Sequence, residues 1–400
     1  MIQVGCRAYR QLTFATALGS FVVFCNLYLF QPLLPMFAEQ WRMSETQVNS
    51  VLAITTFMLA LTLIPCAALS EKIGRRPVML AGLAVLPLLS VLMANTTTFS
   101  MLVFYRGLVG VALAGYAAVA VAYMAEELSP SAFKLALGGY ISANSIGGIA
   151  GRISGGLLND WFGWSTAVWI LAVFSLLSVI FIARCLPKQR HFVPVNGGMK
   201  TIHRQLVMHA RNAQLLPAIL IGGFNFAIFV NLYSVMSFRL VGAPFYLPVG
   251  YASLIFLCYL AGTITSKFSG YWLIVGRTST GMLLGAIVSA MGMLVAAKDN
   301  IAYMLLGLLL VSAGAFFIHS LAYSWVGEKA QQGKATANAL YLVSYYVGGS
   351  LGGYLLLSAW QQYQWTGVMA AGGILYIVLI IAISKVRQQE EHVALEAVSN

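Results

Sequence analysis

Charged residues are scarce in this chain, and acidic residues are the scarcest. Asp, Glu, Lys and Arg make up only 8% of the 400 residues, and 60% of the residues are hydrophobic. A water-soluble domain carries roughly a quarter charged residues, so this composition excludes a water-soluble globule. The apolar runs are long and continuous. This also excludes an outer-membrane barrel, because its strands alternate in hydropathy over short segments.

The sequence patterns of an enzyme or a metalloprotein are also missing. The five cysteines are scattered, and no pair has the spacing of a metal site or a redox pair. We find neither a Walker-type nucleotide motif nor a set of residues that could act as nucleophile, base and acid. The chain is therefore not expected to be an enzyme or to bind a cofactor or a metal.

What the chain does contain is about a dozen apolar runs, each close to the roughly 20 residues that a bilayer-spanning helix needs. The expected spans are residues 12–34, 47–69, 77–95, 100–125, 133–158, 165–186, 213–238, 248–268, 278–297, 301–325, 335–359 and 367–386. This pattern predicts an all-α membrane protein with twelve transmembrane helices: a six-helix bundle at 1–186, a cytoplasmic linker at 187–212 and a second six-helix bundle at 213–400. Residues 199–211 are basic and loosely amphipathic, which predicts a linker helix at the membrane surface.

The basic residues are distributed unevenly over the predicted loops. Eighteen of the 23 Lys and Arg residues fall in the segments that include the termini and the linker or in the span ends next to them, three fall in the opposite loops, and two, Arg106 and Arg152, lie deep within spans. Cytoplasmic loops of membrane proteins carry such an excess, so both termini are predicted to be cytoplasmic. The net charge of +12 then reflects membrane topology. We expect the lipid bilayer, and not nucleic acid, as the partner of these charges.

The two halves of the chain resemble each other at an offset of about 200 residues. Residues 24–28 in the first span correspond to residues 229–233 in the seventh. Gly147-Gly148 in the fifth span corresponds to Gly348-Gly349 in the eleventh. Duplicated bundles are typical of transporters that move two halves around a central site.

The loop after the second span carries a charged motif. Residues 67–76 read AALSEKIGRR, which is similar to the G-x-x-x-D-R-x-G-R-R pattern of the major facilitator superfamily. A carboxylate among cations on a tight turn can pair with a neighbouring helix end in one state and release it in another. We therefore expect this loop to act as a conformational switch. The residues that carry the similarity are Glu71, Lys72, Gly74, Arg75 and Arg76.

The fifth span carries a glycine-rich face. Glycines recur there at every fourth residue, which strips one helix face of side chains and lets another helix approach closely. The spacing resembles the antiporter signature of the major facilitator superfamily, with Arg152 at the position of its proline. The residues at the signature positions are Gly138, Gly147, Gly151, Gly155 and Gly156.

The resemblance to the superfamily extends from end to end of the chain. In the fourth span, Arg106, Gly110 and Ala114 are similar to its R-x-x-q-G-x-x-x-A pattern. Residues 138–156 further resemble the bacterial YnfM-type, or acriflavine-sensitivity, family of drug efflux proteins. The resemblance implies the major facilitator fold, a location in the bacterial inner membrane, and export of small amphipathic molecules driven by protons. We expect the transporter to be a monomer.

Charge placement within the spans gives independent information. Arg106, Arg152 and His319 are expected inside spans, whereas every Asp and Glu falls at a span end, in a loop or in the tail. An intramembrane charge needs a partner. The two arginines either cap helix carbonyls or reach Glu39 or Asp160, or else they line a cavity and hold an anionic substrate group or a coupling carboxylate. His319 either packs through a hydrogen bond or carries the coupling proton, because imidazole changes its protonation near neutral pH.

Polar and aromatic side chains near the span centres make up the predicted substrate cavity. Aromatic faces with a few polar groups suit bulky, loosely specified ligands, although the same residue types also hold membrane helices together. The predicted cavity residues are Asn26, Tyr28, Gln31, Asn144, Asn225, Asn231, Tyr233, Tyr341 and Tyr345.

Taken together, the sequence predicts a secondary active transporter, and specifically a proton-coupled exporter of small amphipathic compounds. The absence of carboxylates at span centres, together with Arg106 and Arg152, motivates an alternative, which is an organic-anion transporter. A third hypothesis, from a different functional class, is a membrane sensor that has kept the fold and lost transport.

Overall fold

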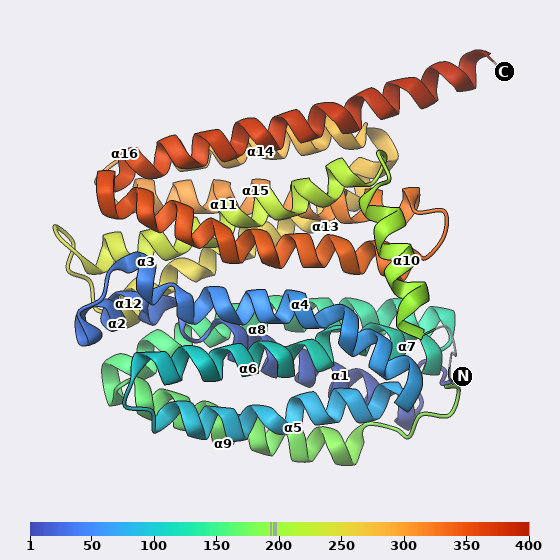
Figure 1. The fold of residues 1–400 in the computed structure, drawn as a ribbon, viewed down its shortest axis with the longest axis horizontal. Coiled ribbons are helices and arrows are strands. Elements are labelled where there is room, and N and C mark those ends of the chain that lie inside the picture. The colour runs from blue at the N-terminus through green and yellow to red at the C-terminus, as the bar shows by residue number, and fades with distance from the viewer. Residues whose placement is uncertain (193, 195–197, 400) are drawn as a thin grey trace. The chain divides into compact units, whose positions relative to one another are not determined.

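The computed structural model describes residues 1–192, 194 and 198–399. Throughout this part of the chain the regular structure is helical, apart from an isolated bridge between Ile2 and Leu128. Most helices are long rods, as expected for a chain that satisfies its backbone within each span (Figure 1). The predicted all-α fold is therefore confirmed.

The helices follow the predicted order along the chain. The first half contains α1 (Arg7–Tyr28), η1 (Gln31–Leu33), α2 (Leu34–Trp41), α3 (Glu45–Val48), α4 (Ser50–Ile73), α5 (Arg75–Ala94), α6 (Phe99–Ala117), α7 (Ala120–Glu127), α8 (Pro130–Phe162) and α9 (Trp164–Cys185). The linker contains α10 (Gly198–Ala210), so a helix is present where one was predicted. The second half contains α11 (Leu216–Val241), α12 (Val249–Ser253), η2 (Leu254–Cys258), α13 (Tyr259–Val275), α14 (Thr278–Val295), α15 (Ile301–Lys329) and α16 (Lys334–Ser399).

Ten helical stretches in the described part of the chain are long and apolar enough to cross a membrane. The last of them contains two predicted spans, because α16 is interrupted at Gln364, whose backbone is not helical (φ 52°, ψ −145°). The glycine-rich α8, at 33 residues, is also long enough to span a bilayer. With α8 and the two parts of α16 counted separately, the described helices account for the twelve predicted spans.

The first span differs from the prediction of one continuous helix over residues 12–34. α1 ends at Tyr28, and the chain continues through η1 and α2, each of which has a proline as its second residue, Pro32 and Pro35. Proline lacks the N–H that an α-helix needs and clashes with the preceding turn. The prolines therefore break the span and leave the carbonyl groups at the end of α1 without partners inside the helix.

Contacts divide the chain into two compact units. Unit 1 comprises residues 1–43, 50–200 and 240–254, and unit 2 comprises residues 44–49, 201–239 and 255–400. Each unit therefore consists mainly of one half of the sequence and includes one short segment from the other half. Within unit 1 the short helix α12 packs on α8, and within unit 2 the short helix α3 packs on α16.

In unit 1, α8 lies against α1 along its glycine face. A Cβ atom at Gly147 would lie 2.6 Å from the carbonyl oxygen of Phe21, and one at Gly151 would lie 2.7 Å from the Cα atom of Cys25. Gly155 similarly faces the backbone of Leu29. Because these neighbours are backbone atoms, any side chain on this face would push the two helices apart.

Unit 2 repeats this arrangement between α16 and α11. Gly348 lies against the backbone of Gly223, and a Cβ atom at Gly352 would lie 2.7 Å from the Cα atom of Ala227. The fifth and eleventh spans thus use glycines in the same way against the first and seventh spans. This supports the duplication that the sequence comparison of the two halves indicates.

The glycine contact of α8 gives a matched pair of variants. Gly151→Leu should lower the free energy of unfolding of the purified protein by about 1–3 kcal/mol or more, because it forces a side chain into a backbone contact. Gly138→Leu lies on the same helix, where a Cβ atom would meet nothing within 4 Å. It should change stability by no more than about 0.5 kcal/mol. Thermal unfolding in detergent measures both, and equal effects would contradict the packing described here.

Candidate functional site

Arg106 of α6 is completely buried beside the broken end of α1. It donates hydrogen bonds from Nη1 to the carbonyl of Asn26 and from Nη2 to that of Leu27, each at 2.7 Å. Its Nε donates to the carbonyl of Val51 at 3.1 Å. Because α1 ends at Tyr28, the first two carbonyls belong to its last turn, where helix carbonyls have no partner within the helix. This geometry favours carbonyl capping as the role of Arg106.

Arg152 of α8 forms a cluster with two predicted cavity residues of unit 1. Its Nε donates to Gln31 Oε1 at 2.7 Å, and its Nη1 donates to the carbonyl of Gly148 at 2.8 Å. The guanidinium carbon lies 3.6 Å from the centre of the Tyr28 ring. A cation over an aromatic face in a dry environment is stabilised by about 2 kcal/mol or more. The side chain of Arg152 is 1% exposed, so this charge is held inside the unit.

The two predicted asparagines of unit 1 have different surroundings. Asn26 is buried and donates from Nδ2 to the carbonyl of Val22 and to Ser175 Oγ, so it ties α1 to α9. Asn144 is only partly buried, and its Oδ1 has no hydrogen-bond partner among the described residues. Of these two asparagines, Asn144 is therefore the one whose amide oxygen can still accept a hydrogen bond from a ligand.

The predicted acidic residues Glu39 and Asp160 are exposed, on α2 and near the end of α8. Asp160 Oδ2 accepts a hydrogen bond from the backbone N–H of Gly250 at 2.7 Å. This N–H belongs to the first turn of α12, and a carboxylate is stabilising at a helix N-terminus. Asp160 therefore holds α12 against α8.

The predicted switch loop joins α4 to α5 at Gly74, whose φ of 103° favours glycine. Arg75 Nε donates to Glu126 Oε1 of α7 at 2.9 Å. Arg76 Nη2 donates at 2.9 Å to a carbonyl in the last turn of α9. The loop is thus bound to two other helix ends of unit 1. Glu71 and Lys72 are the other two predicted switch residues. Neither makes a hydrogen bond or an ion pair with the described residues.

The sequence did not reveal that the beginning of the linker completes this loop. Gln189 Oε1 accepts from the backbone N–H groups of Arg75 and Arg76, at 2.9 and 3.2 Å, and Gln189 Nε2 donates to Glu126 Oε2 at 3.2 Å. Glu127 Oε1 accepts from two successive backbone N–H groups of the linker. The N-terminus of α5 begins after a glycine and so lacks a side-chain cap of its own. A distant glutamine supplies it.

In unit 2, the predicted residues His319, Tyr341 and Tyr345 lie together. Tyr341 Oη is 2.9 Å from His319 Nδ1, and the ring centres of His319 and Tyr345 are 4.6 Å apart. Tyr345 in turn stacks on Phe226 with ring centres 3.8 Å apart. His319 and Tyr345 are only partly buried, whereas Tyr341 is fully buried. Among the described residues, His319 Nε2 has no hydrogen-bond partner.

The other predicted cavity residues of unit 2 connect helices. Asn225 Nδ2 donates to a carbonyl of α15, and Asn231 Nδ2 donates to the carbonyl of Gly349 in α16, both at 2.9 Å. Tyr233 Oη lies 2.6 Å from Ser312 Oγ of α15. All three are at most 4% exposed. They hold α11 to its neighbours, which is the alternative role that polar residues have in membrane bundles.

Asn49 is a buried polar residue of unit 2 that the sequence did not single out. It is 1% exposed, and neither Nδ2 nor Oδ1 has a hydrogen-bond partner in the described part of the chain. Asn231 Oδ1 is likewise unpaired. Both side chains lie beside Gly353, where a Cβ atom would be 2.8 Å from Asn231 Oδ1. Asn49 lies near the start of the predicted span 47–69, and nothing in the sequence indicated that it would lie beside Asn231.

Arg239 follows the predicted span 213–238, yet it is only 5% exposed at the end of α11. Its Nη1 donates to the carbonyl of Ala296 and its Nη2 to Asp299 Oδ1, both at 2.6 Å. It therefore caps the end of α14, as Arg106 caps the end of α1.

Within the described residues, no group of three or more His, Cys, Asp or Glu side chains is placed to hold a metal ion.

The capping role of Arg106 predicts a loss of stability on substitution. Arg106→Met should destabilise the protein by about 3 kcal/mol or more, because it leaves buried carbonyl groups unpaired. Arg42→Met, at an exposed position after α2, is the control and should leave unfolding within about 0.5 kcal/mol of the wild type. An Arg106→Met protein of normal thermal stability would show that Arg106 is not a structural cap.

Comparisons with known proteins agree with this architecture. The family profile described as Major Facilitator Superfamily matches residues 16–353. The inner membrane transport protein YnfM of Escherichia coli (strain K12) is 34% identical over 383 residues, which cover 96% of this chain and 91% of that protein. The uncharacterized MFS-type transporter YybF of Bacillus subtilis (strain 168) is 32% identical over 382 residues, which cover 96% and 94%.

Solved structures show the same fold at low identity. A peptide transporter POT in complex with sulfate aligns with a TM-score of 0.78 and 12% identity, covering 94% of each chain. The human organic anion transporter MFSD10 (TETRAN) aligns with a TM-score of 0.71 and 18% identity, covering 94% of this chain and 99% of that one. The chain belongs to the major facilitator superfamily and is a multi-pass membrane transporter of the YnfM type.

Proposed function

We propose that this transporter is a proton-coupled exporter of small amphipathic compounds and that His319 carries the coupling proton. The observation that carries the proposal is the cluster of His319, Tyr341, Tyr345 and Phe226 in unit 2. It combines a partly exposed imidazole with two stacked aromatic rings. An aromatic surface with one polar, titratable group suits a bulky ligand with a small polar part.

His319 is the best-placed proton carrier in the spans. The described Asp and Glu residues lie at helix ends, in loops or near the C-terminus, so no carboxylate competes for this role at a span centre. An ionisable residue inside a transmembrane bundle is costly to bury, so its presence there indicates a functional role. Tyr341 fixes the orientation of the ring through Nδ1, and Nε2 is left for the proton or the substrate.

The glycine face of α8 supports an exchange mechanism. It brings α8 and α1 into backbone contact, and the corresponding signature in the superfamily is that of antiporters. The switch loop supports alternating states, because its contacts to α7 and α9 are hydrogen bonds and ion pairs that can be exchanged at little cost. We propose that Arg75 releases Glu126 when the transporter changes state. We also propose that the protein is a monomer in the bacterial inner membrane and that both termini face the cytoplasm.

An organic-anion transporter is the alternative that the arginines motivated. One of the fold neighbours is named an organic anion transporter. Each nitrogen of Arg106, however, is engaged by a backbone carbonyl. The alternative therefore requires that an anion displace the present partners of Arg152, which include Gln31 and the carbonyl of Gly148. A membrane sensor without transport is a third hypothesis, and measurable flux excludes it.

The coupling role predicts that His319→Gln uncouples transport from protons. In proteoliposomes with an imposed pH gradient, gradient-driven transport of an amphipathic dye should fall to about one tenth of the wild-type rate, because glutamine cannot titrate. Exchange of dye without a pH gradient should persist. His203→Gln, in the exposed part of the linker helix, is the control and should behave like the wild type. Unchanged pH dependence in His319→Gln would refute the coupling role.

Arg152 separates the two substrate classes. If amphipathic compounds bind at the aromatic cluster of unit 2, Arg152→Gln should leave the ratio of cationic to anionic dye transport within about threefold of the wild type, because it removes no direct contact with the dye. If Arg152→Gln instead lowers anionic dye transport tenfold or more relative to cationic dye transport, the result would support the organic-anion alternative. Dye flux in the same proteoliposomes measures this ratio, with protein stability checked in parallel.

A further inference from the structure

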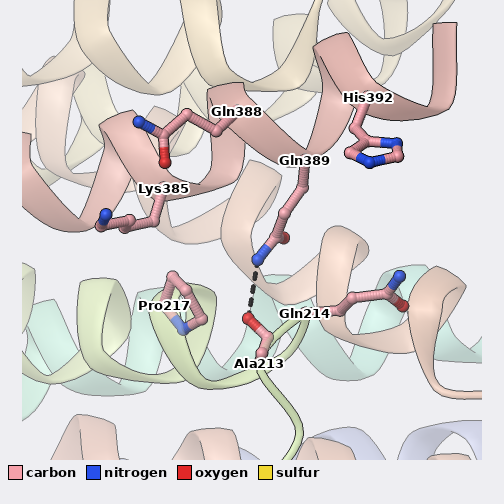
Figure 2. A pocket seen from close by; sticks show the side chains of 7 residues that line it. All are labelled: Ala213, Gln214, Pro217, Lys385, Gln388, Gln389 and His392. Carbon is pink, nitrogen blue, oxygen red and sulfur yellow. Dashed lines mark hydrogen bonds between the residues drawn. The ribbon is translucent and has the colours of Figure 1, made fainter. Parts of the chain in front are cut away.

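A cavity of about 480 Å³ lies in unit 2 between the start of α11, with the chain before it, and the last turns of α16. Figure 2 shows that Lys385, Gln388, Gln389 and His392 of α16 line one side, with the chain from Ala213 to Pro217 on the other. All of the lining residues are neutral or basic. The proposed transport mechanism does not use this cavity.

The acidic residues of this part of α16 are engaged elsewhere. Glu390 accepts hydrogen bonds from the backbone N–H groups of Thr278 and Ser279 at the start of α14. Glu391 pairs with Arg387 at 2.9 Å. Lys385 has no ion-pair partner among the described residues. The cavity therefore has a positive charge that no carboxylate among the described side chains of α16 neutralises.

Gln389 adds a second requirement for a ligand. Its Nε2 donates to the carbonyl of Ala213 at 2.6 Å, which fixes the amide across the cavity (Figure 2). Its Oε1 is buried and has no hydrogen-bond partner in the described residues. A buried acceptor without a donor costs about 1–3 kcal/mol. A ligand that fits here must therefore bring a hydrogen-bond donor as well as a negative charge.

An apolar stripe runs along α16 from the membrane interior to this cavity. Ile377, Ile381 and Lys385 follow one another at intervals of four residues, so they lie on one face of the helix. Ile377 and Ile381 are 59% and 55% exposed. On the α11 side, Leu220 is 39% exposed and lies three residues after Pro217, which lines the cavity. The surface of α16 thus changes from apolar to cationic along the helix. An anionic phospholipid changes in the same order, from apolar acyl chains to a charged headgroup, and its headgroup has the opposite charge.

We propose that this cavity binds the headgroup of an anionic glycerophospholipid. The phosphodiester lies against Lys385, a hydroxyl of the headgroup donates to Gln389 Oε1, and an acyl chain lies along the stripe of Ile377 and Ile381. Phosphatidylglycerol has this combination of one negative charge and headgroup hydroxyls. Basic pockets between transmembrane helices at the membrane surface bind anionic headgroups by this chemistry.

Native mass spectrometry of the full-length protein with added phosphatidylglycerol tests the proposal. Lys385→Glu should weaken the binding of phosphatidylglycerol at least about fivefold, because each lysine near an anionic headgroup contributes about that factor. Lys267→Glu makes the same charge change at an exposed position of α13 and should bind like the wild type. Gln389→Leu should weaken phosphatidylglycerol more than phosphatidic acid, whose headgroup has no glycerol hydroxyls.

Three results would overturn the proposal. Equal binding of phosphatidylglycerol by Lys385→Glu and Lys267→Glu would show that the cavity is not the site. Binding of phosphatidylcholine as tight as that of phosphatidylglycerol would show that the site does not recognise the negative charge. Occupation by inorganic phosphate or glycerol phosphate at the same affinity would identify a site for free anions instead of a lipid site.

Discussion

The hydrogen bonds from Arg106 to the end of α1 are the interaction on which the arrangement of unit 1 depends. A backbone carbonyl in a bilayer has no water to pair with, so a helix can end inside a span only where another group supplies donors. Arg106 supplies them to Asn26 and Leu27. The chain can then turn after Tyr28 and place the Tyr28 ring and the Gln31 amide against Arg152.

The two units share a scaffold and differ in what they place on it. In both, glycines of one helix meet the backbone of another, α8 on α1 and α16 on α11. Beside this contact, unit 1 holds the buried charge of Arg152, whereas unit 2 holds the partly exposed ring of His319. A buried, fixed charge and a partly exposed imidazole suit different roles. This difference is the physical basis for assigning the coupling proton to unit 2.

Hydropathy and the distribution of charge predicted the helices, and short matches between the two halves predicted the duplication, because these features repeat along the sequence itself. The family was predicted from the resemblance of residues 67–76 and 138–156 to known motifs. The break after Tyr28 was missed, although Pro32 and Pro35 were visible, because membrane helices tolerate proline where a neighbour restores the lost hydrogen bonds. Partners across helices, such as Gln189 at the start of α5 or Asn49 beside Gly353, depend on tertiary packing. No spacing along the chain indicates them. The roles of Arg106 and Arg152 remained open for the same reason.

The central functional claim is that proton movement and substrate movement are coupled through His319. It is tested most directly by recording the internal pH of proteoliposomes when an amphipathic substrate is added. The account predicts a substrate-dependent proton flux in the wild type and its loss in a folded His319→Gln protein that still exchanges substrate. A proton flux of unchanged size in that variant would contradict the account.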